Sequence, residues 1–255
     1  MIQDFSQALI RCSALGAVFT EPQAKAAKEA GELSETAKAY LVKIYIKEKY
    51  GREYDIITKY MEKGKTVEEQ SIAMFSLLQQ KEFNKNEDRL SNGIISGTPD
   101  VFEGEKIEEA TAIWDIKSSW NLETFLANVS KPLDKGYFYQ LQGYYWLTGA
   151  ETGGIVYCLT NTPESLLNDE KYRLLKRMDV VSEESPSFIR ASAQLEHNNL
   201  FDDIPISERC LKFEVARNEE IIKKIPEKVE KCRTFLQEFQ EKHLEFNKNT
   251  YIALK

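Results

Sequence analysis

The sequence predicts an α/β protein, in which a mixed β-sheet is flanked by helices. Helix-like periodicity occurs before residue 81, strand-like segments follow between residues 91 and 117, and strands and helices then alternate up to residue 243. Because helices precede, interrupt and follow the strands, we expect them to flank one central sheet that contains both parallel and antiparallel strands, an α/β or α+β arrangement. A chain of 255 residues can bury a full core, so we expect a single domain over residues 1–255.

The first expected helix covers residues 33–51. Ser34 can cap its N-terminus, Gly51 can end it, and apolar side chains recur with helical spacing between Ala37 and Tyr45. A second helix is expected at residues 64–80. Both lie before the strand-like part of the chain.

The strands begin after these helices. Two of them are predicted within residues 91–117, joined by a polar turn at residues 103–106, and this spacing is typical of a β-hairpin. The remaining elements are expected in the order helix (135–149), buried strand (153–160), alternating strand (210–216) and long amphipathic helix (218–243).

Charge is unevenly distributed along the chain. The net charge is −7, yet residues 1–65 carry 11 Lys+Arg against 9 Asp+Glu. The overall balance argues against wholesale attraction to nucleic acid, but a local basic face can still contact phosphates. No apolar run approaches the ~20 residues of a membrane span, and the first residues lack the order of a signal peptide. We therefore expect a cytoplasmic protein.

Cysteine and histidine usage excludes several classes of site. The four cysteines are widely spaced, which disfavours a zinc knuckle or a compact disulfide framework and favours free thiols. The two histidines, His197 and His243, lie in polar surroundings, so histidine-based nucleases and Ser-His-Asp enzymes are disfavoured. The GKT triplet at residues 64–66 is not a phosphate-binding loop, because Lys59 stands where that motif needs glycine.

Charged residues interrupt the expected hairpin. Asp100 follows a proline, and Asp115 and Lys117 lie within an apolar strand, where alternation places both of them on one face. If the two strands pair, Asp100 can approach Asp115, and two close carboxylates repel each other unless a cation lies between them. Hard oxygen ligands of this kind suit Mg²⁺ or Mn²⁺.

Lys117 has two possible roles beside such a site. It can orient the attacking water or, with a lowered pKa, act as a base. The alternative is an ordinary surface ion pair between Asp115 and Lys117, and an isolated D-x-K triplet does not distinguish these possibilities.

Four motifs in order resemble the PD-(D/E)XK nuclease superfamily, in its lambda-exonuclease/YqaJ-like (RecB-like) branch. They are G-x-x-x-E at residues 64–68, GTPD ending at Asp100, DIKSSW beginning at Asp115, and Q-x-x-x-Y from Gln140 to Tyr144. The resemblance covers about residues 60–240. It implies a restriction-endonuclease-like core at residues 61–245 with a helical extension at residues 1–60.

The resemblance also implies roles for individual residues. Glu68, Asp100, Asp115 and the backbone carbonyl of Ile116 would hold Mg²⁺ or Mn²⁺. Lys117 and Gln140 would complete the catalytic set, and Tyr144 and Ser118 would contact the substrate. Helical spacing places Glu68 toward the core with Ile72 and Phe75, whereas Glu69 is expected to point to solvent. The scattered cysteines depart from the relatives that bind an iron–sulfur cluster.

These implications predict a metal-dependent deoxyribonuclease. By resemblance it would be an exonuclease on duplex ends in phage-type recombination or DNA processing. Its partners would be double-stranded DNA, a single-strand annealing protein and further copies of itself, with a trimer as in the lambda-type relatives. An endonuclease on the same fold and a catalytically silent DNA-binding or interaction module are the alternatives.

Overall fold

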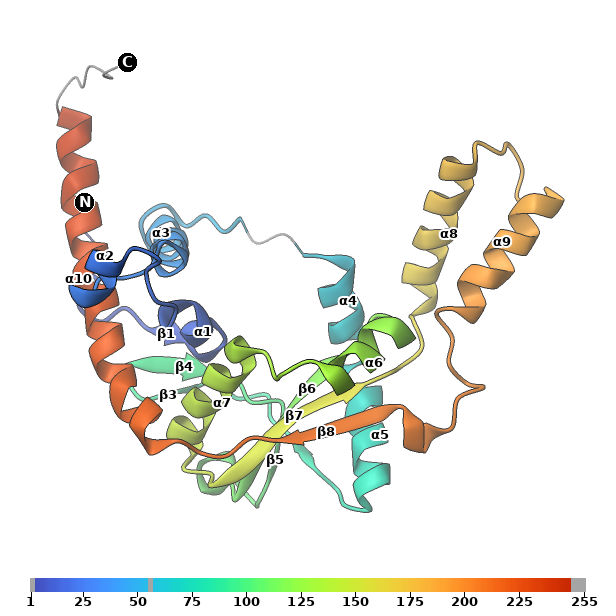
Figure 1. The fold of residues 1–255 in the computed structure, drawn as a ribbon, viewed down its shortest axis with the longest axis horizontal. Helices are drawn as coiled ribbons and strands as arrows, with labels where there is room; N and C mark the ends of the chain where they lie inside the picture. Colours follow the sequence, from blue (N-terminus) through green and yellow to red (C-terminus); the bar gives the residue numbers. More distant parts are fainter. Residues whose placement is uncertain (1–2, 55–56, 249–255) are drawn as a thin grey trace.

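The computed structural model describes residues 3–54 and 57–248 (Figure 1). Its α-helices are α1 (Leu15–Val18), α2 (Lys25–Glu29), α3 (Glu35–Tyr50), α4 (Lys59–Thr66), α5 (Glu68–Gln79), α6 (Leu122–Ser130), α7 (Lys135–Thr148), α8 (Glu164–Met178), α9 (Pro186–His197) and α10 (Glu219–Lys248). Short 3₁₀ turns lie at Cys12–Ala14, Ile107–Glu109 and Ile206–Glu208. Within the described residues, no helix is both long enough and apolar enough to cross a membrane.

The main sheet has five strands in the order β2-β5-β6-β7-β8. Their bounds are β2 (Asn84–Lys85), β5 (Val101–Glu103), β6 (Ala112–Ser118), β7 (Thr152–Cys158) and β8 (Cys210–Glu214). β6 and β7 are parallel, and the other neighbours are antiparallel. The predicted mixed α/β class is therefore confirmed, as is the hairpin, which is formed by β5 and β6.

The chain also forms a second, smaller sheet, which the prediction of one central sheet missed. Its order is β1-β4-β3, with bounds β1 (Ile10–Arg11), β4 (Ile95–Gly97) and β3 (Leu90–Ser91). The first strand expected within residues 91–117 is thus divided between two sheets. Pro99 lies at the division, and because proline has no N–H to donate, a continuous ladder cannot run through it.

The helices cover both faces of the main sheet (Figure 1). The larger apolar core packs α1, α3, α7 and α10 against one face, and a smaller core packs α5 against the other. Strand β6 contributes to both cores, because Ile113 joins the first while Trp114 and Ile116 join the second. This alternation decides the surroundings of Asp115 and Lys117.

The expected helix ends agree with the structure in some elements and not in others. α3 begins with Ser34, whose side chain accepts a hydrogen bond from Ala37 N, and ends at Gly51 with φ 61°. The helix expected at residues 64–80 is instead two helices, α4 and α5, which meet at Val67. Lys63 of α4 is fully buried and donates to the Trp120 carbonyl at 2.8 Å, so α4 is fixed to the segment after β6.

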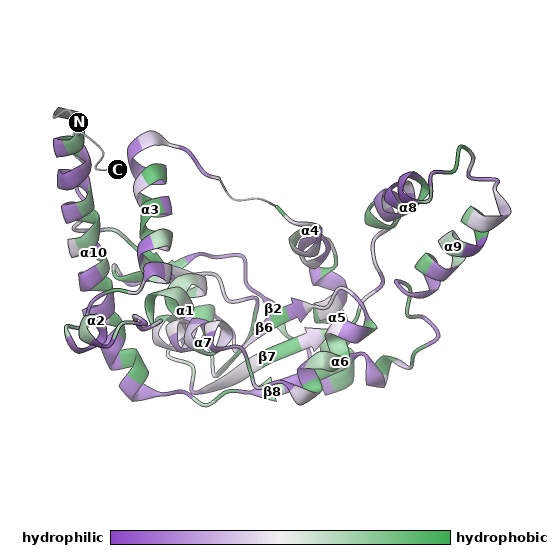
Figure 2. Ribbon diagram, turned by 45° about the horizontal axis from the view of Figure 1, so that its top comes forward, coloured by the Kyte–Doolittle hydropathy of each residue, from purple (hydrophilic) through white to green (hydrophobic). Residues whose placement is uncertain are grey.

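The helices α8 and α9 form a hairpin that projects from the body of the molecule, and this hairpin was not predicted (Figures 1 and 2). Phe188 is buried within the pair, while Tyr172, Val181 and Ile189 are exposed. The cysteines are free, as expected; three are buried and Cys210 is partly buried.

Candidate active site

The candidate site lies where β5 begins beside the end of β6. Val101 pairs with Trp114 in the antiparallel ladder, so continuing the register by one residue places Asp100 opposite Asp115. Asp115 and Lys117 both project toward α7, since Trp114 and Ile116 occupy the face toward α5. The predicted approach of the two acids is what the strand register produces.

Asp100 is held by the backbone of the neighbouring strand. Its Oδ2 accepts a hydrogen bond from Ile116 N at 2.7 Å, and its own carbonyl accepts one from Asn86 N at 2.9 Å. Burial, and after it the carboxylate of Asp115, raise the pKa of Asp100 above its ordinary value. The Ile116 hydrogen bond and the charge of Lys117 oppose this shift without cancelling it. Two negative charges at this site are therefore unfavourable even with Lys117 beside them.

Asp115 is only 1 % exposed and contacts two of the predicted residues. Its Oδ2 lies 2.5 Å from Lys117 Nζ, and its Oδ1 accepts a hydrogen bond from Gln140 Nε2 at 3.1 Å. Burial alone would lower the pKa of Lys117, but the carboxylates of Asp115 and Asp100 outweigh it and raise the pKa above its ordinary value. Lys117 also lies 4.9 Å from the centroid of the Tyr137 ring.

Helix α7 extends this set through Tyr144. Gln140 Nε2 donates to Tyr144 Oη at 2.8 Å, and Tyr144 Oη donates to the Thr98 carbonyl at 3.2 Å. The ring of Tyr144 packs against Gly97, where an added Cβ would lie 2.6 Å from Tyr144 Cε1. Tyr144 thus ties α7 to the segment that leads into Asp100.

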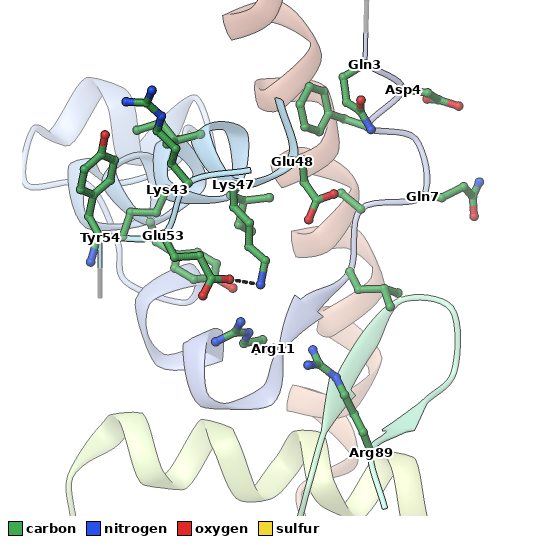
Figure 3. Close-up of a pocket in the computed structure, with 17 residues that line it drawn as sticks. Gln3, Asp4, Gln7, Arg11, Lys43, Lys47, Glu48, Glu53, Tyr54 and Arg89 are labelled. Atoms are coloured by element: carbon green, nitrogen blue, oxygen red, sulfur yellow. Dashed lines mark ion pairs between the residues drawn. The ribbon is translucent and has the colours of Figure 1, made fainter. Parts of the chain in front are cut away.

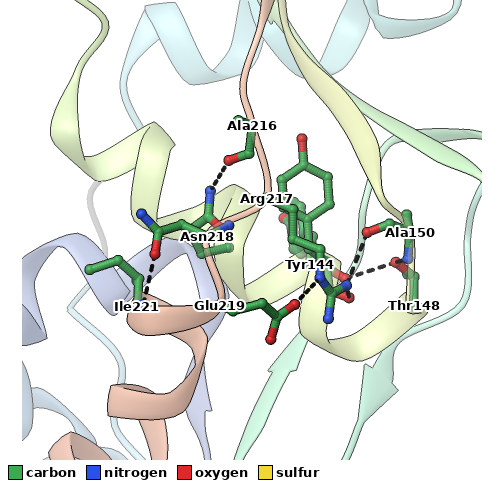
Figure 4. A network of polar contacts seen from close by, with 10 residues as sticks. Tyr144, Thr148, Ala150, Ala216, Arg217, Asn218, Glu219 and Ile221 are labelled. Carbon is green, nitrogen blue, oxygen red and sulfur yellow. Dashed lines mark hydrogen bonds and ion pairs between the residues drawn. The ribbon is translucent and has the colours of Figure 1, made fainter.

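The opposite side of α7 is fixed to the start of α10, as Figure 4 shows. Gln142 Nε2 donates to the Ala216 carbonyl at 3.0 Å, and Gln142 Oε1 accepts from Asn218 N at 2.7 Å. Arg217 Nη1 donates to the carbonyls of Tyr145 and Ala150 at 2.8 and 3.0 Å. Gln142 therefore faces away from the acids, and this network holds Gln140 on the side that faces them.

Glu68 lies at the first position of α5, at the edge of the site. It is not buried with Ile72 and Phe75 as expected, because its side chain is 34 % exposed and its Oε1 lies 3.6 Å from Lys85 Nζ. Glu69, 84 % exposed, lies at the same distance from Lys85. Glu68 is less exposed than Glu69, as expected. Because α5 begins at Glu68, however, its side chain remains partly exposed to solvent.

Ser118 points to the other side of the sheet from the predicted residues Asp115 and Lys117. Its hydroxyl lies 3.0 Å from the Ser71 hydroxyl of α5, on the face of β6 opposite to Lys117. Ile116 presents its backbone amide to Asp100, as described above. The structure thus brings Asp100, Asp115, Lys117, Gln140 and Tyr144 into one connected set, and it places Glu68 and Ser118 at the margins of this set.

The residues present fit a divalent cation with few protein ligands. Asp115 Oδ2 is buried and receives no well-aligned hydrogen bond from the described residues, despite the nearby ammonium group. Across residues 3–54 and 57–248, no three acidic, histidine or cysteine side chains converge closely enough to hold a metal by themselves. Mg²⁺ commonly binds through one or two carboxylates, with waters and substrate phosphate completing its shell. Two facing aspartates with spare oxygen capacity suit this arrangement.

Several residues of the site were missed by sequence reasoning. Asn86 is buried and donates through Nδ2 to the Pro99 carbonyl at 3.0 Å, which fixes the residue before Asp100. Lys85 pairs with Glu68, and Ser71 contacts Ser118. Each lies in a polar stretch or on a helix whose pattern shows no functional signal. Only the hairpin register and the packing of α5 bring them to the site.

Comparisons with known proteins identify the same fold in solved exonuclease structures. A phage-related exonuclease from Haemophilus somnus 129PT matches with a TM-score of 0.71 and 25 % identity, over 92 % of this chain and 96 % of that one. An alkaline exonuclease from Laribacter hongkongensis, LHK-Exo, matches with a TM-score of 0.60 and 15 % identity, over 94 % and 93 %. Its complex with dAMP matches with a TM-score of 0.57 and 16 % identity, over 96 % and 94 %.

No family model and no curated protein matches the sequence. The structural matches nevertheless extend over nearly the whole chain, so they include the segment before residue 60 as well as the part that carries the motifs. They confirm the predicted resemblance to lambda-exonuclease/YqaJ-like nucleases and its mixed α/β fold.

Proposed function

We propose that this chain is a metal-dependent DNA exonuclease that hydrolyses phosphodiester bonds at duplex ends. The observation that carries the proposal is the pairing of Asp100 with Asp115, with Lys117 beside them, within a fold shared with exonucleases. An ordinary ion pair would need one acid for one lysine. Here a second acid, the partly buried Asp100, lies opposite Asp115 in the strand register, and the carboxylate of Asp115 adds to burial in raising its pKa.

Asp100 and Asp115 would hold Mg²⁺ or Mn²⁺, with Glu68 and the Ile116 carbonyl as further ligands. Bound there, the cation would neutralise the carboxylates and stabilise the charge that develops on the scissile phosphate. Lys117 would position the attacking water or take its proton. Gln140 would hold Asp115 in place, while Tyr144 would fix the segment that precedes Asp100.

The arrangement of domains and subunits belongs to the same proposal. Residues 61–245 would form the nuclease core and residues 1–60 an extension, within one domain over residues 1–255. Threading of a DNA end through an oligomer, in which residues 1–60 line the entrance, would restrict cutting to free ends, since contacts to phosphates alone do not select a sequence. A single-strand annealing protein would receive the product in phage-type recombination or DNA processing.

Digestion of linear and covalently closed circular DNA, side by side with Mg²⁺, tests the proposal. We expect the linear duplex to disappear and the circles to persist, and we expect the protein to elute from a sizing column above its 29.4 kDa. Asp115→Asn serves as the negative control. Rapid nicking of circles by wild type, but not by the control, would identify an endonuclease, and no cleavage of either DNA would reject the nuclease proposal.

A further inference from the structure

A second region of interest is a cavity of about 470 Å³ between the N-terminal segment, α3 and Arg89 (Figure 3). None of the proposed catalytic residues lines it. Among the described residues, five arginine or lysine side chains line the cavity against three acidic ones, although the whole chain has a net charge of −7. Positive charge is therefore concentrated here against the overall balance.

Two arginines of this cavity are fixed at the same residue of the small sheet. Arg11 of β1 is the ladder partner of Ser96 on β4, and Arg89 Nη2 donates to the Ser96 hydroxyl at 2.8 Å. Figure 3 shows both guanidinium groups pointing into the space below Lys47. Ser96 itself is 1 % exposed, so both arginines are tied to a buried position of the small sheet.

The acids of the cavity leave positive charge uncompensated. Glu53 forms an ion pair with Lys47, and Asp4 Oδ1 accepts a hydrogen bond from the backbone N–H of Ser6 at 2.8 Å. None of the ion pairs within residues 3–54 and 57–248 involves Arg11 or Lys43, although Arg11 adds to Lys47 in lowering the pKa of the Glu53 carboxyl. Like charges that line one cavity repel each other, and an anion between them would reduce the repulsion.

The residue to which the two arginines are tied is close in sequence to the paired acids Asp100 and Asp115. Ser96 and Asp100 are four residues apart, so their Cα atoms are separated by at most ~14 Å even in extended chain. A nucleic-acid strand carries one phosphate per ~3.4 Å of helix axis. The arginines tied to Ser96 therefore lie within the reach of a few nucleotides from a strand held at Asp100.

We propose that this cavity binds the phosphodiester backbone of a DNA strand whose scissile bond is held at Asp100 and Asp115. The inference rests on the proposed function, since it takes DNA as the ligand and uses the position of the acidic cluster. Arg11 and Arg89 supply forked donors that match phosphate oxygens. Lys43 adds a further cation from α3.

Fluorescence anisotropy with a short labelled single strand, in EDTA and over a series of salt concentrations, tests this proposal without requiring cleavage. The double variant R11Q/R89Q should bind more weakly, and its plot of log K against log salt should be shallower by roughly 0.7 for each lost phosphate contact. K43Q, an exposed side chain outside the β-ladders, should lose a smaller part of the slope. Unchanged thermal midpoints would verify that both variants fold.

The matched control is R177Q/R190Q, which makes the same charge change on exposed positions of α8 and α9. Equal weakening by this control, or wild-type slopes in both cavity variants, would overturn the proposal. Free dAMP distinguishes a nucleotide site from a strand site. If dAMP displaced the strand and itself lost affinity in R11Q/R89Q, the cavity would be a mononucleotide site. Absent cleavage by wild type with Mg²⁺ would reject the nuclease proposal separately, because the binding measurement does not depend on it.

Discussion

The two faces of strand β6 differ in what they contribute to the protein. Toward α5, Trp114 and Ile116 pack with Phe75, whose ring centroid lies 5.6 Å from that of Trp114. Toward α7, Asp115 and Lys117 place charges in a largely buried position, which costs free energy unless they are paired. The seven residues of β6 thus contain one face that stabilises the fold and another whose charges the proposed catalysis would explain.

The largest expected effect is on the charged face. Asp115→Asn and Lys117→Ala should each abolish cleavage, because several kcal/mol of barrier lowering would be lost at ~1.4 kcal/mol per tenfold in rate. Circular dichroism and a thermal melt should show a folded protein in both cases. Near-wild-type digestion of linear DNA by either purified variant would separate this face from catalysis.

The apolar face should give the opposite result. Phe75 is fully buried and stacks on Phe83 at 4.4 Å, so Phe75→Ala should lower the free energy of unfolding by ~3–5 kcal/mol. Urea denaturation with an unchanged m-value measures this loss. Activity per folded molecule at low temperature should change far less than in the Asp115 and Lys117 variants. A stability loss below ~1 kcal/mol would contradict the packing difference between the faces.

The acids should also make stability depend on pH when no divalent cation is present. Asp100 has a raised pKa in the folded protein, so the folded state binds its proton more tightly than the unfolded state does. The resulting stabilisation is present at acidic pH and is lost as pH rises from the ordinary aspartate value of 3.8 through the raised one. Mg²⁺ should restore stability at the alkaline end of this window.

Thermal midpoints measured at several pH values, with EDTA and with Mg²⁺, check this expectation. Asp100→Asn provides the control, since it should flatten the pH dependence and remove the response to Mg²⁺. If the stability of the wild type instead increased with pH in EDTA, the pH dependence would have the opposite sign to the one expected. Asp100 would then be ionised in the folded protein without a divalent cation.

The sequence was sufficient to predict the charged face but not everything around it. Strand alternation places Asp115 and Lys117 together, and helical spacing places Gln140 and Tyr144 together, because both are local geometry. The exposure of Glu68 was mispredicted, since it depends on where α5 begins, and the break at Val67 has no clear signal. Lys63, an apparently ordinary surface lysine, is fully buried because α4 packs against the segment after β6.

The second sheet and the projecting hairpin were missed for related reasons. β1, β3 and β4 are two or three residues long, so none has enough alternation to identify a strand. Their pairing joins residues 10–11 to residues 95–96, a contact between distant parts of the chain. The helices α8 and α9 bury one side only, and the polar loop between them resembles the rest of their exposed surface.

Two glycines, Gly97 and Gly64, offer smaller changes in which only one methyl group is added. Gly97→Ala should place a methyl group 2.6 Å from Tyr144 Cε1 and 2.9 Å from Cys12 Sγ, so Tyr144 or β4 must move. We expect a stability loss of ~1–3 kcal/mol from overpacking. We also expect slower cleavage, because Tyr144 and Gln140 would shift relative to Asp115.

Gly64→Ala is the matched glycine-to-alanine change in α4, and its expected effect is the smallest. A Cβ at Gly64 meets no atom of the described residues within 4 Å, and Gly64 lies inside α4, where alanine is a better helix former by up to ~1 kcal/mol. The protein alone therefore gives no steric reason for glycine at this position, and Gly64→Ala should unfold at a slightly higher temperature with unchanged cleavage. If stability rose as expected but cleavage fell, the space over Gly64 would be needed by the substrate, because no atom of the described residues lies within 4 Å of the added Cβ.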